Sequence, residues 1–443
     1  MAQLALLGGP KSVTLDYETE GNLPIVSQKA IDAAVELMKK GEISTSPVVA
    51  EFEARFTKYI GVKYGACLSN GTSCLQSALF GVGVGPGDEV IVPSFTFWAS
   101  AAPIIAANGV PVFCEVDPDT HCIDPADVEK RITPKTKAIM VVHVWGTPCD
   151  MDAIMAIAKK HDLRVIEDCS HAHGAMYKGK KVGSIGDVGC FSMQGSKILV
   201  AGEGGILVTN NKDYYERAIA LGCYERLGAL DDSSVYKQYS LTGMGHKFRC
   251  HPVGIAIANV EFDDLDRRNK IRNDNALYLE KQISDIDFIA LQKTYDDCEK
   301  EFSYHYARYD HEKFGGIRLV TLLKALAAEG VICGLCGYGH LHEAKLFTDG
   351  DVHGKGCPVK CPYAAENRTS AGLSLPITEY LADAAFMLAP RFEKPCKDLL
   401  DQYAAAYHKV AANLDELKAY ETEHAEELAS IKPKSGRSIN LFK

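Results

Sequence analysis

Short apolar strands alternate with helices over residues 65 to 225, and this alternation limits the chain to a small set of folds. The stretch "YGACLSNGTSCLQSALFGVGV" reads as strand, turn and helix, and "EVIVPSFTFWASAAPIIAANG" repeats that order. The segments "PVFCEVD", "KAIMVVHVWG" and "DLRVIEDCS" continue the pattern. Strands that alternate with helices are typical of a largely parallel sheet with helices on both faces. We therefore predict an α/β fold with a mostly parallel central sheet.

The segments on either side of this region divide the chain. Residues 26 to 62 have a helical pattern, and a long charged helix, "IANVEFDDLDRRNKIRNDNALYLEKQI", follows the alternating region. It leads to the strand "EFSYHYARYD", the helix "IRLVTLLKALAAEGV" and a helical region from about 378 to 428. We predict three parts: an N-terminal helical segment at 1–60, a large α/β domain at 61–275, and a smaller α+β C-terminal domain with a helical tail at 276–443.

Charge and composition argue against several classes of protein. The 48 basic and 58 acidic side chains give a net charge of -10, and the chain has no basic stripe of the kind that binds nucleic acid. No apolar stretch approaches the length of a membrane span, and "MAQLALLGGPKSV" lacks the basic flank of a signal peptide. Fifteen cysteines without a framework are typical of reduced thiols. We expect a cytoplasmic protein with no nucleic-acid or membrane partner.

Two strand ends carry residues suited to a flat, phosphorylated ligand. Ligands of open α/β sheets bind where the strands deliver residues from their carboxyl ends. The turn "SNGTS", residues 69–73, opens a helix whose N–H groups and dipole suit a phosphate, although Ser and Thr also serve as simple helix caps. The segment "SFTFWAS" places Phe97 and Trp98 at a strand end, where an indole either packs in the core or stacks on a heteroaromatic ring.

A third strand end, in "VIEDCSHAHGA", carries the carboxylates Glu167 and Asp168. A carboxylate at the end of a central strand costs free energy unless it is paired, and a protonated pyridine nitrogen is one such partner. The alternative is a metal held by Asp168, His171 and His173. The spacing of these three residues does not bring them all to one face of a regular element.

The fourth strand end, "CFSMQGSKILVAGEGG", has a lysine between a buried strand and a glycine-rich turn. Ser192 is placed to bind a phosphate and Lys197 to form a Schiff base. A nucleotide-binding P-loop is excluded because the order is Gly-Ser-Lys and the spacing after Gly189 is wrong. A phosphate turn, an aromatic ring, a buried aspartate and a lysine, in this order, together describe a site for pyridoxal phosphate (PLP).

The chain also resembles a known family over most of its length, from about Leu4 to Pro376. The matching stretches are "GPGDEVIVPSFTFWAS", "VFCEVDPDT", "VVHVWGTPCDMDAI", "IEDCSHAHGA", "GSIGDVGCFSMQGSK", "GEGG", "GHKFRCHPVGIAIA" and "CPYAAENRTSAGLSLP". On these motifs it is identified as a member of the DegT/DnrJ/EryC1/StrS family of PLP-dependent sugar and cyclitol aminotransferases. The resemblance implies the aspartate-aminotransferase-like fold, fold type I, with PLP bound in the large domain.

The resemblance also assigns roles to single residues. It implies that Lys197 forms the Schiff base with PLP and that Asp168 pairs with the pyridinium nitrogen. The other implied cofactor contacts are Gly71, Thr72 and Ser192 at the phosphate, Trp98 on the ring, and His171 near the phenolic oxygen. The segment "GHKFR" matches the family stretch that reaches into the neighbouring subunit's site. Lys247, which stands where an asparagine is common, would then contact the phosphate of a partner chain in a homodimer with shared sites.

The implied reaction moves an amino group from glutamine or glutamate to a ketone on a sugar or cyclitol, with ping-pong kinetics. Arg249 is a candidate for the donor's carboxylate, and His342 is a second candidate for substrate binding. Two alternatives are a PLP-dependent sugar dehydratase of the same fold and a non-catalytic PLP-fold sensor. The dehydratase branch replaces the lysine by histidine, so Lys197 argues against it, and the complete catalytic set argues against the sensor.

Four cysteines have a spacing close to that of a zinc site. Cys333, Cys336, Cys357 and Cys361 form a CxxC and a CxxxC pair with histidines between them. The resemblance offers another explanation, because Cys361 fits an ordinary Cys-Pro pair before "LSLP" and His342 fits a common Leu-His pair. We expect no metal in the protein.

Overall fold

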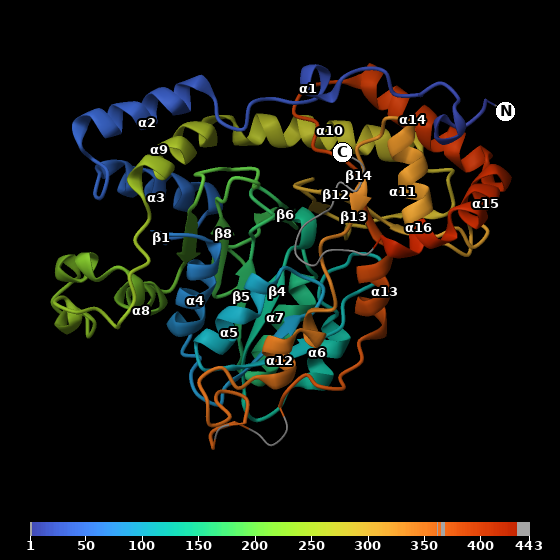
Figure 1. The fold of residues 1–443 in the computed structure, drawn as a ribbon. Helices are drawn as coiled ribbons and strands as arrows, with labels where there is room; N and C mark the ends of the chain where they lie inside the picture. Colours follow the sequence, from blue (N-terminus) through green and yellow to red (C-terminus); the bar gives the residue numbers. More distant parts are fainter. Residues whose placement is uncertain (1, 361, 365–367, 432–443) are drawn as a thin grey trace.

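A seven-stranded sheet forms the centre of the large domain in the computed structural model, which describes residues 2–360, 362–364 and 368–431 (Figure 1). In spatial order its strands are β1 (Tyr64–Leu68), β9 (Gly205–Thr209), β8 (Val188–Ser192), β5 (Arg164–Asp168), β4 (Thr136–Val142), β2 (Glu89–Pro93) and β3 (Val110–Cys114). Among these seven, β9 runs antiparallel to its neighbours β1 and β8, and the remaining pairs are parallel. The predicted mostly parallel sheet is confirmed.

Helices cover both faces of this sheet, because side chains along each strand alternate between two apolar cores. In β4, Ile139 and Val141 belong to one core, whereas Ala138 and Met140 belong to the other. The first core is covered by α3 (Pro47–Ile60), α7 (Met151–His161) and α9 (Pro252–Glu261), and the second by α4 (Gly71–Gly81), α5 (Ala102–Ala106) and α8 (Lys212–Gly222).

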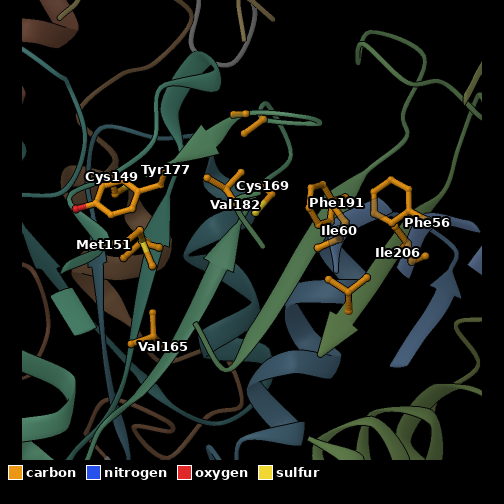
Figure 2. Close-up of a cluster of buried hydrophobic side chains, with 14 of the residues drawn as sticks. Phe56, Ile60, Cys149, Met151, Val165, Cys169, Tyr177, Val182, Phe191 and Ile206 are labelled. Carbon is orange, nitrogen blue, oxygen red and sulfur yellow. The ribbon is translucent and has the colours of Figure 1, made fainter. Parts of the chain in front are cut away.

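Figure 2 shows part of the first core, where α3 packs against the sheet. The ring of Phe56 meets that of Phe191 edge to face, with centroids 5.0 Å apart, and Ile206 lies beside them. Burying an aromatic side chain of this size stabilises the fold by roughly 1.5–3 kcal/mol. The packing fixes the position of β8, whose carboxyl end carries Ser192 and leads to Lys197.

A four-stranded antiparallel sheet forms the small domain, in the order β10 (Ile289–Leu291), β12 (His305–Tyr309), β14 (Ala385–Ala389) and β13 (Gly334–Leu335). It shares a core with α10 (Leu265–Gln282), α11 (Leu319–Ala328) and α14 (Lys397–Ala412). The expected helical region from 378 to 428 is wrong at β14. That apolar segment follows α13 (Pro376–Ala384) but is mostly buried and pairs with β12 and β13.

The long charged helix predicted after the large domain is interrupted. It forms α9 and α10, with a 3-10 turn at Phe262–Asp264 between them, and α10 crosses from the large domain to the small one (Figure 1). The remaining helices and short strands are α1 (Tyr17–Glu20), α2 (Gln28–Lys40), α6 (Pro125–Arg131), α12 (Lys345–Asp349), α15 (Leu414–Glu423), α16 (Ala425–Ser430), β6 (Met176–Tyr177), β7 (Lys180–Lys181) and β11 (Cys298–Glu299).

The segment predicted as an N-terminal helical unit, 1–60, divides between the two domains. Leu4 and Val13 lie in the core of the small domain, and the Glu329 carboxylate accepts hydrogen bonds from the backbone N–H groups of Ala5 at 2.7 Å and Ser12 at 3.0 Å. The helices α2 and α3 instead pack against α9 in the large domain. Residues 4–40 therefore form an N-terminal strap that joins the two domains (Figure 1). Within the described ranges, none of the helices combines the length and the apolar character of a membrane span.

Candidate active site

A cavity of about 690 Å³ lies at the carboxyl ends of β2, β4, β5 and β8, beside the small domain. Its wall contains seven of the predicted site residues: Gly71, Thr72, Trp98, Asp168, His171, Ser192 and Lys197. The small domain contributes Tyr304, Tyr306, Cys336, Gly337 and Tyr338 to the same wall. Residues from distant parts of the sequence thus meet where the two domains face each other.

The start of α4 forms a cradle with the end of β8. The Asn70 side chain accepts a hydrogen bond from the Ser73 backbone N–H at 2.8 Å, and the Ser73 hydroxyl accepts one from the Asn70 N–H at 3.1 Å. This capping box uses the N–H of Ser73, while those of Gly71 and Thr72 have no acceptor inside the helix. A Cβ atom on Gly71 would lie 2.7 Å from the Cβ of Ser192. The close approach of helix and strand therefore requires glycine there, and it turns N–H groups and a hydroxyl toward one place.

Asp168 is a buried carboxylate at the end of β5. Its Oδ2 accepts a hydrogen bond from the Ser100 hydroxyl at 2.8 Å, and its Oδ1 accepts one from the Ser170 backbone N–H at 3.1 Å. The Thr96 and Ser100 hydroxyls lie 2.9 Å apart, which extends the network. In the described part of the chain, no Lys, Arg or His side chain forms an ion pair with Asp168. A buried anion without a counter-charge costs several kcal/mol, so the cavity favours a cation beside it.

Lys197 enters the cavity from a tight turn after β8. Its backbone N–H donates to the carbonyl of Gln194 at 2.8 Å, and the Gln194 side chain accepts hydrogen bonds from the N–H and the hydroxyl of Ser196. The Lys197 Nζ lies 5.9 Å from the centre of the Tyr304 ring. In the described residues this ammonium group has no ion-pair partner. The turn therefore places the Lys197 amine at the cavity wall, where no salt bridge with a described residue engages it.

His171 and Tyr304 form the side of the cavity next to this lysine. Their rings meet edge to face with centroids 5.0 Å apart. Burial lowers the pKa of His171 well below its ordinary value, and the nearby charge of Lys197 acts in the same direction. Burial opposes ionisation of Tyr304, but the charge of Lys197, the hydrogen bond with Ser196 and the charge of Arg391 together hold the pKa of this phenol below its ordinary value. His171 is thus a neutral imidazole at physiological pH.

The two tryptophans occupy opposite environments. Trp98 is 49% exposed at the cavity wall, with its ring centroid 5.1 Å from that of Phe97. Trp145 is 2% exposed and stacks on Tyr306 with centroids 4.4 Å apart. Trp145 therefore packs in the protein core. Trp98 instead leaves a ring face open to a ligand in the cavity.

Three predicted residues lie outside the cavity wall. Lys247 is exposed on a segment whose Phe248 carbonyl accepts a hydrogen bond from the Ser69 N–H at 2.7 Å. Arg249 follows it and pairs with Leu68 at the end of β1. His342 is buried, with its Nδ1 2.8 Å from the Ser94 hydroxyl. Lys247 and Arg249 thus lie beside the turn predicted to bind phosphate, while His342 contacts the residue that follows β2.

The Glu167 carboxylate, next to the candidate metal ligand Asp168, is held by contacts of its own. Glu167 accepts backbone hydrogen bonds from Gly183, Ile185 and Gly186 and lies 3.1 Å from the Nε2 of His143. Asp168, His171 and His173 do not converge among the described residues. Of the four cysteines, Cys333 and Cys336 are buried, with the Cys333 thiol 3.6 Å from the Leu323 carbonyl, and Cys361 lies outside the described residues. The absence of a metal remains a prediction.

Sequence reasoning missed two groups in the wall. Ser100 is the last residue of the segment "SFTFWAS" and lies three residues before Pro103. A serine at this position is common at the start of any helix. Tyr304 lies in "EFSYHYARYD", which reads simply as a strand of the second domain. The signal that would have found them is the run of polar and aromatic residues after β2 and before β12.

The architecture and the cavity define a fold type I enzyme, with a lysine and a buried aspartate at the strand ends of a mostly parallel sheet. The sequence profile of the DegT/DnrJ/EryC1/StrS aminotransferase family matches residues 24–387. The chain belongs to this family and is an aminotransferase.

Relatives and a solved structure agree with this assignment. The L-glutamine:2-deoxy-scyllo-inosose aminotransferase of Streptoalloteichus tenebrarius is 35% identical, over 73% of this chain and 79% of its own. The enzyme of the same name from Streptomyces lividus is 39% identical over 63% of this chain and 66% of its own. The crystal structure of an aminotransferase from Psychrobacter cryohalolentis superposes with a TM-score of 0.74 at 27% identity, covering 89% of this chain and 100% of that one.

Proposed function

We propose that this chain is a PLP-dependent aminotransferase that transfers the amino group of L-glutamine to the ketone of a cyclitol. The observation that carries the proposal is the presence of Lys197 and the buried Asp168 in one cavity, neither paired with an opposite charge within the described residues. The names of the curated relatives support the donor and the class of acceptor.

Three features of the cavity fit PLP. The N–H groups at the cradle of Gly71 and Ser192 suit a phosphate dianion. Asp168 has no cationic partner among the described residues, and a protonated pyridine nitrogen would be one. Trp98 leaves an indole face open to a flat ring. When bound, PLP would supply an electron sink that stabilises the charge left when the donor's α-proton is removed.

The protein's own residues divide the remaining work. Lys197 is the proton carrier, because its Nζ, held at the cavity by the Gln194 turn, is a base once it is uncharged. The Ser100 hydroxyl and the Ser170 N–H both donate to the Asp168 carboxylate and fix its orientation. His171 adds shape without charge, because burial lowers its pKa.

The rest of the wall suits a polyhydroxylated acceptor. A volume of about 690 Å³ is ample for a cofactor and a six-membered ring. Tyr304 and Tyr338 provide aromatic faces for C–H groups and phenols for hydroxyls. The donor and the acceptor would use this one cavity in turn, so ping-pong kinetics are expected.

The proposed enzyme is a homodimer whose two sites are shared. Lys247 is exposed beside the phosphate turn of its own chain and does not reach that chain's cavity. A phosphate dianion gains from a further cation, and a two-fold axis would deliver Lys247 to the partner's cavity. The fifteen scattered cysteines support a cytoplasmic location for the enzyme.

The decisive experiment is a panel of cyclitol and sugar ketones assayed with L-glutamine, L-glutamate and L-alanine, with the product identified by mass spectrometry. We expect an amine from a cyclitol ketone, fastest with glutamine. A deoxygenated product without added nitrogen would identify a dehydratase instead. A protein that binds PLP but aminates none of the ketones would be a sensor.

A further inference from the structure

A second, smaller cavity of about 50 Å³ adjoins the first, and Lys197 lines both. Its other walls come from the N-terminal strap, from α9 and α10, and from the loop after β14. The side chains that matter most are Tyr17, Glu261, Arg268, Arg391 and Glu393. The cavity thus lies where the strap and both domains meet, next to the reactive amine.

Apart from Lys197, the charged side chains around this cavity are paired, with the exception of Arg391. Arg268 pairs with Glu261 at 3.0 Å and with Glu393 at 3.1 Å, and Arg272 pairs with Glu393 at 2.8 Å. The guanidinium of Arg391 makes no ion pair and donates no hydrogen bond within the described part of the chain. The carboxylates nearby are therefore already neutralised, and Arg391 is left as a cation without a partner.

The backbone around Arg391 is held firmly in place. The Arg391 carbonyl accepts a hydrogen bond from the Tyr17 hydroxyl at 2.8 Å, and the Glu393 N–H donates to the Gly21 carbonyl at 2.7 Å. Between them, Phe392 is buried with its ring edge to face with Tyr17, 5.8 Å between centroids. A guanidinium on such a support is positioned in advance for a ligand, which reduces the entropy lost on binding.

The charge of Arg391 also acts on the main cavity. It contributes, after burial and Lys197, to the lowered pKa of His171. On Tyr304, where burial acts in the opposite direction, Lys197 and Arg391 both favour the ionised phenol. The positive field of Arg391 therefore reaches the place where a substrate would react.

We propose that Arg391 binds the α-carboxylate of the amino donor. This inference rests on the proposed function, because it assumes an amino acid whose α-carbon must come close to Lys197. A guanidinium binds a carboxylate with two parallel hydrogen bonds and so fixes its orientation as well as its position. A cyclitol ketone has no carboxylate, so Arg391 would bind the donor and not the acceptor. The structure thereby favours Arg391 over Arg249, which lies outside both cavity walls.

The test compares two donors, L-glutamine and L-glutamine α-amide, in which the α-carboxylate is replaced by a carboxamide. In the wild-type enzyme we expect kcat/KM to be on the order of 100-fold higher for L-glutamine, the usual scale for losing a charged hydrogen-bonded pair. Arg391→Gln should lower kcat/KM for L-glutamine by about that factor and leave the α-amide little changed. Arg391→Lys should recover part of the loss. The kcat/KM for the ketone should stay within about twofold, whereas a fall in that kcat/KM alone would assign Arg391 to the acceptor and overturn the proposal.

A binding measurement makes the result independent of turnover. Glutaramate is glutamine without its α-amino group, so it carries the carboxylate but cannot react. Calorimetry on the PLP-loaded protein should show its affinity reduced about 30-fold or more by Arg391→Gln. The matched control is Arg267→Gln, an exposed arginine of α10 paired with Asp264. It should change nothing.

The outcomes separate this inference from the proposed function. Amine formation with unchanged donor discrimination in Arg391→Gln would reject the role of Arg391 and leave the aminotransferase intact. Loss of glutaramate binding in Arg391→Gln without amine formation from any donor would keep the carboxylate site and reject the proposed reaction. A glutaramate affinity that falls with Arg249→Gln instead would return the role to Arg249.

Discussion

The hydroxyl of Ser100 lies 2.8 Å from Oδ2 of Asp168, and both side chains are almost completely buried. The hydroxyl donates its hydrogen bond to this oxygen and so fixes the orientation of the carboxylate. A residue after β2 thereby positions a residue at the end of β5. The pair is the structural basis for the proposed partnership with a protonated ring nitrogen.

Removing either member of this pair should reduce turnover without unfolding the protein. We expect Asp168→Asn to retain some PLP but lose activity by about 100-fold or more, because the compensating charge is gone. Ser100→Ala should cost about tenfold, the scale of one hydrogen bond to a charged group. The control is Ser77→Ala, which removes a buried hydroxyl of α4 that has no hydrogen-bond partner among the described residues. Near-normal turnover in Asp168→Asn would contradict the assigned role.

Lys197→Ala should abolish the covalent attachment of PLP. The wild-type protein is expected to be yellow, and borohydride should bleach it while adding the mass of reduced PLP to the peptide that contains Lys197. The variant should show neither the stable colour nor the mass. Lys180→Ala, at an exposed lysine of β7, serves as the control and should behave as wild type. If Lys197→Ala kept both the modification and the activity, another lysine would hold the cofactor.

Shared sites predict an unusual pattern of complementation. Chains carrying Lys197→Ala and Lys247→Ala should each be inactive alone, but their heterodimer should recover about half the wild-type activity, because one site has both lysines. The control pairs a wild-type chain with a chain carrying both substitutions. If the sites are shared, this control heterodimer is inactive. If each site forms within one chain, the control is half active and the heterodimer of the two single variants is inactive.

Gly71→Ala should weaken the binding of PLP. Its Cβ would approach the Cβ of Ser192 to 2.7 Å, so α4 and β8 would have to separate at the cradle. Overpacking of this kind costs roughly 1–3 kcal/mol, and we expect PLP affinity to fall by at least tenfold. Equilibrium dialysis would measure it. Gly85→Ala is the matched control, because a Cβ there meets nothing within 4 Å. Equal affinities in the two variants would rule out the cradle.

Glu301 should make stability depend on pH. Burial raises the pKa of this carboxyl from 4.5 to about 7, so the folded protein holds a proton that the unfolded chain has released. The stabilisation, on the order of 3 kcal/mol, is present below about pH 4.5 and is lost as the pH rises toward 7. Glu301→Gln should flatten the slope of the unfolding free energy over that range by up to one proton, measured by urea titration. The exposed Glu426→Gln should not, and an unchanged slope in Glu301→Gln would refute the assignment.

The large-domain half of the site could be predicted from the sequence because each of its residues lies at or shortly after the end of a recognisable strand. In parallel strands the carboxyl ends meet at one edge, so the residues after β1, β2, β5 and β8 had to converge. Gly71, Asp168 and Lys197 therefore lie in one wall, as their order along the chain indicated. The likeness to a family supplied the names of their roles.

The other half depends on how the two domains pack, and no local pattern encodes that. Tyr304 and Arg391 reach the cavities from a sheet formed by residues far along the chain. His342 appeared suited to substrate, yet folding places it against Ser94, where it supports the end of β2. The strand β14 was hidden because the short apolar segment "AFMLA" has no periodicity that separates it from the helix before it.

The N-terminal strap has a consequence for the order in which the molecule is made. Leu4 and Val13 leave the ribosome long before Val410 and Leu417, which belong to the same core. At roughly 5–20 residues per second, about 400 residues take roughly 20–80 s to synthesise. During that interval the earliest apolar side chains have no place to bury. The strap therefore docks late, and its apolar side chains must be shielded, by the growing chain or by a chaperone, until the residues around Leu417 have been made.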